Sequence, residues 1–279
     1  MGHQKLAALI TLAGTKTITS RDNPTLKSLR ALATDGREIR RQGRTLIDGP
    51  HLVAAYLQRR GSPDLLVVSE SGQAKREVRD LLTKCGAAET LSVPDALFRE
   101  LSGVTSPVGL LAVISIPETQ DDAQQGSSVV LDGIQDAGNV GAILRSAAAA
   151  GMVEVVLGPG CAGAWTPRVL RAAQGAHFAL RIRELSDPGR YVQTFAGTSI
   201  AAVARGGMSL YEIDLSTDVV WILGNEGSGV SESLLALSRR RATIPLAPGS
   251  ESLNVAAAAA ICMFEGVRQR LVRKGGSHD

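Results

Sequence analysis

Between residues 128 and 246, short apolar segments recur along the chain, and stretches with the character of helices separate them. Each segment is apolar at nearly every position, instead of alternating between apolar and polar side chains. That pattern is typical of strands covered on both faces, as in a mostly parallel sheet between two layers of helices. We therefore predict a parallel α/β domain whose strands are SVVLDGI, EVVLG, FALRI, SIAAVA, VVWILG and ATIPL.

The first part of the chain also alternates between predicted helices and strands. A helix is expected in NPTLKSLRALA, where Leu26, Leu29 and Leu32 recur at three-residue spacing after Pro24. Further helices are expected in PHLVAAYLQRRG, AKREVRDLLTKCG and ALFREL, and strands in RTLIDG, DLLVVSES, AETLSV and VGLLAVISI. Together these elements predict a small α/β sandwich.

The segment PETQDDAQQGSS is polar and has no periodicity, so it is predicted to be a linker. We predict an N-terminal arm over residues 1–20, a first domain over 21–116, a linker over 117–127 and a second domain over 128–274. The apolar stretch LAALITLAG in the arm is interpreted as a short helix or arm, because Lys5 alone is a thin basic region for a secretion signal. No stretch approaches the ~20 apolar residues of a membrane helix. The predicted location is therefore the cytoplasm.

Charge is distributed unevenly along the chain. Residues 1–116 contain 16 Lys and Arg against 11 Asp and Glu, whereas residues 117–279 contain 14 against 16. A basic module beside a nearly neutral one indicates a polyanionic partner, although a solvated helical surface explains the charge equally well. Aromatic residues make up only 3% of the chain, which disfavours base stacking as a mode of nucleic-acid binding.

The three cysteines, Cys85, Cys161 and Cys262, are odd in number and widely spaced, and no Cys-x-x-Cys occurs. This argues against a disulfide framework or a zinc site and fits a reducing compartment. His3, His51 and His278 lie far from any metal-ligand spacing. No metal is predicted.

In a parallel sheet, ligands are expected in the loops beyond the carboxyl ends of the strands, and three such loops contain polar residues of interest. The first, QDAGNVGAILRSAAAAG, has Gly138 and Asn139 as turn and cap residues and a lone Arg145 inside a small, apolar helix. The second, GNEGSG, carries Glu226 among three glycines. The third, APGSESLNVAAAAA, sets Ser252 and Asn254 at the start of an apolar helix, where they can cap free backbone N–H groups.

Each loop also has an ordinary structural explanation. Taken alone, Arg145 is better explained as half of a structural ion pair, because a buried guanidinium needs a partner. Taken alone, the glycine loop is better explained as a plain turn, and it is neither a Gly-x-Gly-x-x-Gly motif after the first strand nor a P-loop. An acidic residue among glycines suits a cationic or hydroxyl-bearing ligand better than a polyphosphate. The small residues from Ala256 to Ala260 predict a tight crossing of chain segments or a subunit interface.

Taken together and in this order, GNVGAILRSAAAAG, ILGNEGSG and IPLAPGSESLNVAAAAA resemble the three sequence motifs of the SpoU/TrmH family. These proteins are S-adenosylmethionine-dependent RNA ribose 2′-O-methyltransferases of the SPOUT superfamily. The segments ITSRDNPTLKSL, LIDGPHLV and TSPVGLLAV are similar to the substrate-binding domain of the family, which is related to an RNA-binding ribosomal protein. The resemblance covers nearly the whole chain after residue 17.

The resemblance implies a SPOUT fold, in which a mostly parallel α/β domain is knotted because its C-terminal chain threads through a loop to form a trefoil knot. It also implies a homodimer formed through that domain and S-adenosyl-L-methionine as the cofactor. RNA is the implied partner, and rRNA is preferred to tRNA because the two-domain form resembles the rRNA-modifying members.

The motif positions imply specific site residues. The implied catalytic residues are Asn139, Arg145, Glu226, Ser252 and Asn254. The implied cofactor contacts are Gly224, Ile244 and Leu253, with Ala204, Asn225 and Gly227 beside them. Candidate RNA contacts, for which a solvated surface is the plainer explanation, are Arg37, Arg40, Arg41, Arg44, Arg168 and Arg171.

The implied reaction moves a methyl group from a sulfonium to a ribose 2′-OH, which loses its proton as it attacks. The family mechanism assigns proton removal to the arginine, here Arg145. A free guanidinium stays protonated, so Arg145 is equally interpreted as a clamp on the adjacent phosphate and the developing alkoxide. Asn139, Glu226 and Asn254 are interpreted as orienting Arg145 and the ribose. We therefore predict that the three loops meet and that Arg145 faces the cofactor.

Three positions depart from the usual family pattern, and none of them removes a reactive group. Ala137 stands where Pro is frequent, Leu246 where Met is frequent, and Asp48 where Glu is frequent. Two other functions were weighed: an RNA-binding or ribosome-assembly protein without catalysis, and a dinucleotide-dependent α/β enzyme. The intact motif residues disfavour the first, and the lack of an early Gly-x-Gly-x-x-Gly disfavours the second.

Overall fold

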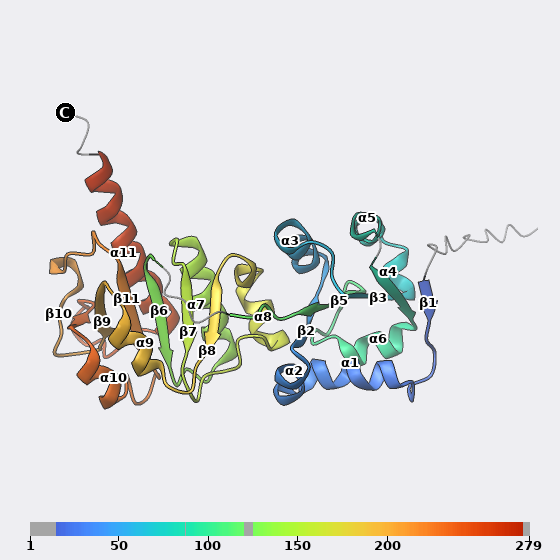
Figure 1. Ribbon diagram of the computed structural model, residues 1–279, viewed down its shortest axis with the longest axis horizontal. Helices are drawn as coiled ribbons and strands as arrows, with labels where there is room; N and C mark the ends of the chain where they lie inside the picture. The colour runs from blue at the N-terminus through green and yellow to red at the C-terminus, as the bar shows by residue number, and fades with distance from the viewer. Residues whose placement is uncertain (1–14, 87, 120–124, 276–279) are drawn as a thin grey trace, which may run out of the picture. The chain divides into compact units, whose positions relative to one another are not determined.

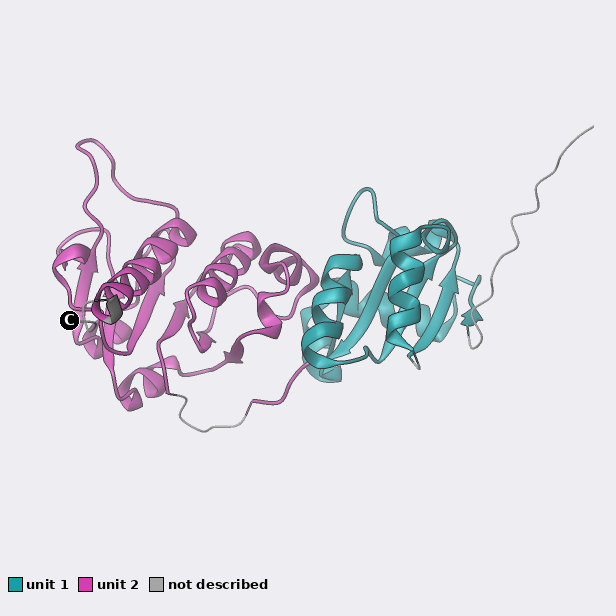
Figure 2. Cartoon of the chain, turned by 90° about the horizontal axis from the view of Figure 1, so that it is seen from above, with its two compact units in different colours: residues 1–115 teal, residues 116–279 magenta. Residues whose placement is uncertain are grey.

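The computed structural model describes residues 15–86, 88–119 and 125–275, and the chain divides into two compact units, residues 1–115 and 116–279 (Figure 2). Residues 1–14 of the predicted arm lie outside the described residues, and so do residues 120–124 of the predicted linker. Each unit has its own sheet and its own core.

The first unit is built on a five-stranded sheet in the order β1-β4-β3-β5-β2 (Figure 1). β4 pairs in parallel with β1 and β3, whereas β5 is antiparallel to β2 and β3. The strands are β1 (Thr15–Thr17), β2 (Arg44–Asp48), β3 (Leu65–Ser69), β4 (Glu89–Val93) and β5 (Leu110–Ser115). The helices are α1 (Pro24–Thr34), α2 (Gly36–Gln42), α3 (Pro50–Arg60), α4 (Glu70–Gln73), α5 (Arg76–Cys85) and α6 (Asp95–Leu101).

Helix α1 forms where the leucine spacing predicts it. The Asn23 side chain caps the helix by accepting a hydrogen bond from the Thr25 N–H at 2.9 Å, and Pro24 occupies the first turn. Leu26, Leu29 and Leu32 are all buried, so one face of the helix packs on the core of the unit.

The second unit is built on a seven-stranded sheet in the order β10-β12-β9-β11-β6-β7-β8. Every pairing in this sheet that the structure describes is parallel, which confirms the predicted architecture. The strands are β6 (Ser128–Asp132), β7 (Glu154–Leu157), β8 (Arg181–Glu184), β9 (Thr198–Ala202), β10 (Met208–Ser209), β11 (Val219–Gly224) and β12 (Arg240–Thr243). The α-helices are α7 (Ala137–Ala149), α8 (Pro167–Ala173), α9 (Pro188–Thr194), α10 (Glu232–Leu237) and α11 (Val255–Gly275).

Both faces of this sheet are covered, as its continuous apolar strands require. Val192 of α9 and Leu234 of α10 pack with Val130, Ala201 and Ile222 of the strands in one buried cluster. Helix α11 packs against α7 and β11, and α7 packs against α8. Because the strands are parallel, their carboxyl ends lie along one edge of the sheet (Figure 1).

Two strands lie a few residues away from the predicted segments. FALRI was predicted to be one strand, but residues 176–178 form a 3₁₀ turn after Gly175, whose φ is 86°, and β8 starts only at Arg181. ATIPL was predicted as a strand, but β12 starts two residues earlier and ends before Pro245, which has no N–H for a ladder bond. β1 and β10 were not predicted, because two or three residues show no periodicity.

In the part of the chain that the structure describes, no helix is long and apolar enough to cross a bilayer. The same residues contain no group of three or more His, Cys, Asp or Glu side chains able to hold a metal ion.

Candidate functional site

Three side chains from separate loops join at the carboxyl edge of the second sheet. The Asn254 Nδ2 atom donates to the Asn139 Oδ1 atom at 3.0 Å, and the Asn139 Nδ2 atom donates to the Glu226 Oε1 atom. Asn139 follows β6, Glu226 follows β11, and Asn254 follows β12. The loops thus meet as predicted, and three of the five implied catalytic residues form one hydrogen-bonded row.

Asn139 is free to join this row because another residue caps its helix. The Asp136 carboxylate accepts a hydrogen bond from the Asn139 N–H at 2.8 Å and is the N-cap of α7. The prediction that Asn139 is itself the cap is therefore wrong. The carboxylate of Asp136 satisfies the backbone, and the amide of Asn139 is left for the neighbouring loops.

Asn254 both caps a helix and contributes to the row. Its Oδ1 atom accepts from the Ala256 and Ala257 N–H groups at 3.0 and 3.3 Å, at the start of α11. Its Nδ2 atom is directed to Asn139. Ser252, predicted to share the capping, makes no side-chain hydrogen bond with any residue that the structure describes, and it lines the adjoining cavity instead.

The glycine loop, residues 224–229, closes on itself. The Asn225 N–H donates to the Gly229 carbonyl at 3.1 Å, and the Gly229 N–H donates back to the Asn225 carbonyl at 2.8 Å. Gly229 has a φ of 73°, which favours glycine. At Gly224 an added Cβ would lie only 2.1 Å from the Gly229 carbonyl carbon, so no side chain fits there.

A cavity of about 400 Å³ lies beside this loop. Its polar rim includes Glu226 and Ser252, and most of its remaining surface is apolar side chain or glycine backbone. Among the described residues, no Lys, Arg or His lines it. All six implied cofactor contacts line it: Ala204, Gly224, Asn225, Gly227, Ile244 and Leu253.

Arg145 stands apart from this cavity. It lies six residues after Asn139 on α7, which places it about 9 Å further along the helix axis and about 120° around it. Its side chain is exposed, does not line the cavity, and forms no hydrogen bond or ion pair with a residue in the described ranges. The interpretation as half of an ion pair is therefore not supported there, and a position facing the cofactor stays a prediction.

The candidate RNA-contacting arginines of the first unit are all exposed, but two of them are paired. Arg41 forms a 2.6 Å ion pair with Glu38, and this hydrogen bond lowers the pKa of the Glu38 carboxyl from 4.5 to about 2. Arg44 forms a 3.2 Å ion pair with Asp64. The Arg37 and Arg40 side chains have no such partner in the described part of the chain.

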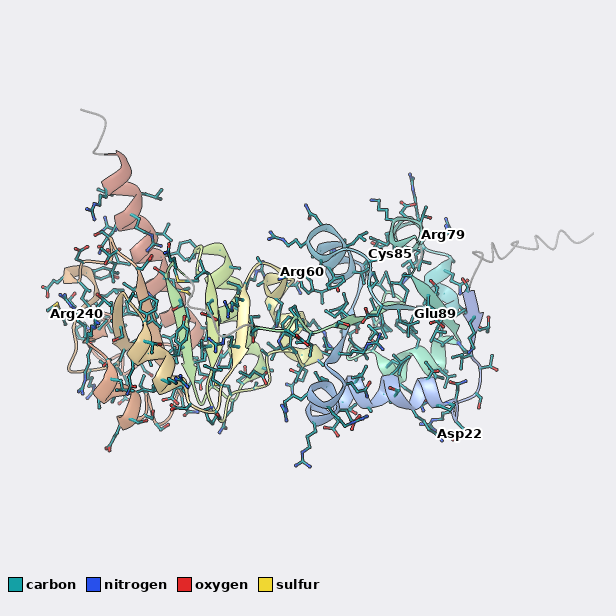
Figure 3. All side chains as sticks on the ribbon, in the orientation of Figure 1. Asp22, Arg60, Arg79, Cys85, Glu89 and Arg240 are labelled. Atoms are coloured by element: carbon teal, nitrogen blue, oxygen red, sulfur yellow. The ribbon has the colours of Figure 1, made fainter. Side chains whose placement is uncertain are left out.

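Other exposed arginines of this unit lie outside the cluster. Arg60 ends α3 and Arg79 lies on α5, and Figure 3 labels both at the surface of the unit. In the second unit, Arg168 on α8 is exposed, whereas Arg171 is half-buried. The two candidates on α8 therefore differ in their access to a ligand, although they are only three residues apart.

One polar residue at this edge was not singled out from the sequence. Asp132, the last residue of β6, accepts a hydrogen bond from the Ser231 N–H through its Oδ2 atom at 2.7 Å. The available signal was a carboxylate at the end of an otherwise apolar strand, directly before Gly133.

Comparison with known proteins identifies the family of the chain. The sequence model of the SpoU rRNA Methylase family matches residues 126–264, and that of the MRM3-like substrate binding domain matches residues 23–112. The chain is 33% identical over 253 residues to the 23S rRNA (guanosine(2553)-2'-O)-methyltransferase RlmP of Bacillus subtilis, which covers 89% of this chain and 98% of that protein.

Two further comparisons agree. The 23S rRNA (uridine(2479)-2'-O)-methyltransferase of Streptomyces viridochromogenes is 26% identical over 266 residues, which covers 91% of this chain and 92% of that protein. The crystal structure of the AdoMet-bound rRNA methyltransferase from Sinorhizobium meliloti has a TM-score of 0.79 and 27% identity, and it covers 91% of this chain and 98% of that chain. These matches confirm the SPOUT-type α/β fold class that the three motifs imply, and the chain belongs to the SpoU rRNA methylase family.

Proposed function

We propose that this protein transfers a methyl group from S-adenosylmethionine to a ribose 2′-OH of rRNA. The observation that carries the proposal is the row of Asn139, Glu226 and Asn254 at the edge of an apolar cavity. Two relatives of the chain are named as 2′-O-methyltransferases of 23S rRNA, which supports rRNA as the substrate.

The cavity fits S-adenosylmethionine in its size and chemistry. Because Gly224 leaves no room for a Cβ, backbone atoms line this wall and can approach a ligand closely. Apolar residues such as Ile244 and Leu253 suit a base and a thioether chain, and the Glu226 carboxylate suits a positive charge. When bound, the cofactor supplies an electrophilic methyl group on a sulfonium.

The hydrogen-bonded row has a fixed direction. Asn254 donates to Asn139, Asn139 donates to Glu226, and the carboxylate is the final acceptor. We assign to this row the orientation of the target ribose, because Glu226 keeps a second carboxylate oxygen that can accept a hydrogen bond from a hydroxyl group. Alignment of the hydroxyl with the methyl group is the main requirement of the reaction.

Arg145 is assigned the role of a clamp on RNA. Its guanidinium is exposed and has no ion-pair partner among the described residues, so it is available to a phosphate and to the oxygen that develops negative charge. In this assignment the leaving proton passes to the phosphate or to water.

The assignment predicts separate effects on binding and on reaction. Because Arg145 does not line the cavity, Arg145→Ala should bind S-adenosylmethionine with wild-type affinity in calorimetry. It should lower the rate of RNA methylation about 100-fold or more, the usual loss when a group that stabilises transition-state charge is removed. Arg190→Ala, an exposed arginine on α9, is the matched control and should methylate normally. Wild-type turnover of Arg145→Ala on a competent rRNA fragment would refute the clamp.

A homodimer formed through the second unit is also proposed. Helix α11 buries Cys262 and Met263 against its own unit, yet it also exposes large apolar side chains. Phe264, Leu271 and Val272 are 45%, 64% and 64% exposed. Exposed apolar surface on a helix supports an interface between subunits.

The dimer predicts a mass of twice the chain in light scattering after gel filtration. Phe264→Glu should shift the protein towards the monomer, because a carboxylate is costly in a buried interface. Glu251→Ala, an exposed change outside the helix, is the control. A monomeric wild type at micromolar concentration contradicts the proposal.

The proposed location is the cytoplasm, where rRNA is accessible and where the three free cysteines remain thiols.

A further inference from the structure

We infer that Asn225 and Asp132 are positioning residues that hold the glycine loop in its ligand-binding shape before the ligand arrives. The inference rests on the proposed function for the identity of the ligand, and it deepens that proposal. It also changes the expectation for Asn225, which the motif resemblance implied to be a direct cofactor contact.

The side chain of Asn225 is already occupied by protein groups. Its Oδ1 atom accepts from the Gly227 N–H at 2.8 Å and from the Ser228 N–H at 3.2 Å. An amide oxygen has two lone pairs, and both are used here. The loop therefore turns around the side-chain oxygen of Asn225, which leaves little of this side chain for a ligand.

The other end of the same amide joins the loop to the neighbouring strand. The Asn225 Nδ2 atom donates to the Gly133 carbonyl at 2.9 Å. Gly133 follows β6, and β6 pairs in parallel with β11 so that Asp132 lies opposite Gly224. This bond fixes the start of the glycine loop to the segment that leads into α7 and Asn139.

Asp132 fixes the segment where the chain leaves the loop. Its Oδ2 atom accepts from the Ser231 N–H at 2.7 Å, one residue beyond the buried Val230. Asp132 does not line the cofactor cavity. Both ends of the glycine loop are thus attached to the carboxyl end of β6, one through Asn225 and one through Asp132.

The two attachments fix the position of Glu226, the residue of this loop that takes part in the hydrogen-bonded row. Glu226 lies between them, and its carboxylate accepts from Asn139. A loop held in one shape by protein bonds loses little conformational entropy when a ligand binds. The attachments therefore raise cofactor affinity without contacting the cofactor, and they align Glu226 with Asn139.

Four variants separate this role from direct contact. Asp132→Ala removes the acceptor of the Ser231 N–H, whereas Asp132→Asn keeps an oxygen there and is the conservative rescue. Asn225→Asp keeps an acceptor for Gly227 and Ser228 but removes the donor to Gly133, whereas Asn225→Ala removes both functions. Asp214→Ala is the matched control, because the Asp214 carboxylate makes the same kind of bond, to the Ser216 N–H at 2.9 Å, outside the cavity lining.

The first measurement is amide hydrogen exchange of the full chain without cofactor. In the wild type, the amides of Gly227, Gly229 and Ser231 should be protected, because each donates within the protein. Asp132→Ala should speed exchange at Ser231 and through the loop, and Asp132→Asn should restore protection. Unchanged exchange in both Asp132→Ala and Asn225→Ala overturns the inference.

The second measurement is the affinity for S-adenosylmethionine by calorimetry, together with steady-state kinetics. Asp132→Ala and Asn225→Asp should each weaken binding about tenfold, the equivalent of one hydrogen bond, and Asp132→Asn should recover most of it. The KM for the cofactor should rise while the KM for RNA stays unchanged. Asp214→Ala should match the wild type in both measurements.

The outcomes distinguish this inference from the proposed function. If the wild type binds cofactor and Asp132→Ala binds it equally well, the positioning role is wrong and the methyltransferase proposal stands. If the wild type binds no cofactor but the exchange pattern is as expected, the loop attachments are supported and the proposed function is wrong. Should Asp132→Ala fail to fold in a thermal melt, Asn225→Asp carries both measurements, and unchanged exchange at Gly227, Gly229 and Ser231 together with unchanged affinity overturns the inference.

Discussion

At the scale of single residues, the site depends on which polar group satisfies which backbone. Asp136 caps α7 and frees Asn139, whereas Asn254 caps α11 with its oxygen and contributes its nitrogen to the row. The motifs implied that Asn139 and Asn254 belong to the site, but nothing in them pointed to Asp136. Which of these side chains caps a helix and which joins the row was not predictable, because this depends on loop geometry that no spacing in the sequence encodes.

His177 gives a prediction about pH. It is fully buried between Trp165, whose ring centroid is 5.1 Å away, and the Ala164 carbonyl, which lies 2.7 Å from Nε2. Burial lowers the pKa of His177 from 6.5 to about 4. The folded state therefore binds a proton less tightly than the unfolded state, so the penalty is absent above pH 6.5 and stability is lost as the pH falls from 6.5 towards 4.

The loss should approach about 3 kcal/mol at the acid end, as expected for a shift of this size. Urea unfolding of the wild type from neutral pH down to the lower pKa measures it. His177→Gln, which keeps a donor for the Ala164 carbonyl, should make stability less dependent on pH over the same window. An equal acid dependence in His177→Gln would contradict the assignment.

At the scale of elements, strand character decided which predictions succeeded. β6, β7, β9 and β11 each contain a continuous apolar run and were recognised, because both faces of these strands are covered. β8 was misplaced because its sequence, RIRE, has the composition of a surface segment. Its Arg181 and Arg183 instead face the buried Glu154 of β7, at 3.2 and 3.8 Å, so the charges lie inside and are compensated there.

The glycine loop gives a prediction about close packing. In Gly224→Ala the new methyl group would lie 2.1 Å from the Gly229 carbonyl carbon, so the loop must open to admit it. We expect cofactor affinity to fall at least tenfold and the free energy of unfolding to fall by about 1–3 kcal/mol. Calorimetry and urea unfolding check the two effects.

Gly227→Ala is the control in the same loop. There the added Cβ would meet only the Asn225 Oδ1 atom, at 3.3 Å, and the backbone is not in the left-handed region. It should cost much less stability than Gly224→Ala. Equal losses in the two variants would show that the close approach at Gly224 has no special role.

At the scale of the whole molecule, the two units have separate tasks in the proposed function. The cavity and its polar row lie entirely in the second unit, whereas Arg37 and Arg40, two candidate RNA contacts without an ion-pair partner among the described residues, lie in the first. In the sequence, the polar segment and the charge imbalance predict a division of this kind. The ion pair of Arg44 with Asp64 was not predictable, because the fold brings these two residues together, whereas the pair of Arg41 with Glu38 is a local contact between residues three apart on α2.

This division predicts how salt affects RNA binding. Each phosphate contact that is lost lowers the slope of log affinity against log salt by about 1, so the double variant Arg37→Ala/Arg40→Ala should lower it by about 2. Arg41→Ala, whose guanidinium already neutralises Glu38, should change it less. Filter binding to an rRNA fragment across a salt series measures the slopes. Equal slopes for the wild type and the double variant would exclude these two arginines as RNA contacts.

The cap of α11 has a consequence during synthesis of the chain. One member of the polar row, Asn254, is held in place by the first turn of the last helix that the structure describes. During synthesis, residues 139 and 226 emerge long before this turn can form. A nascent or prematurely terminated chain that stops short of α11 thus lacks the turn that holds the Asn254 donor in place, and methylation competence begins only after the start of this helix has been made.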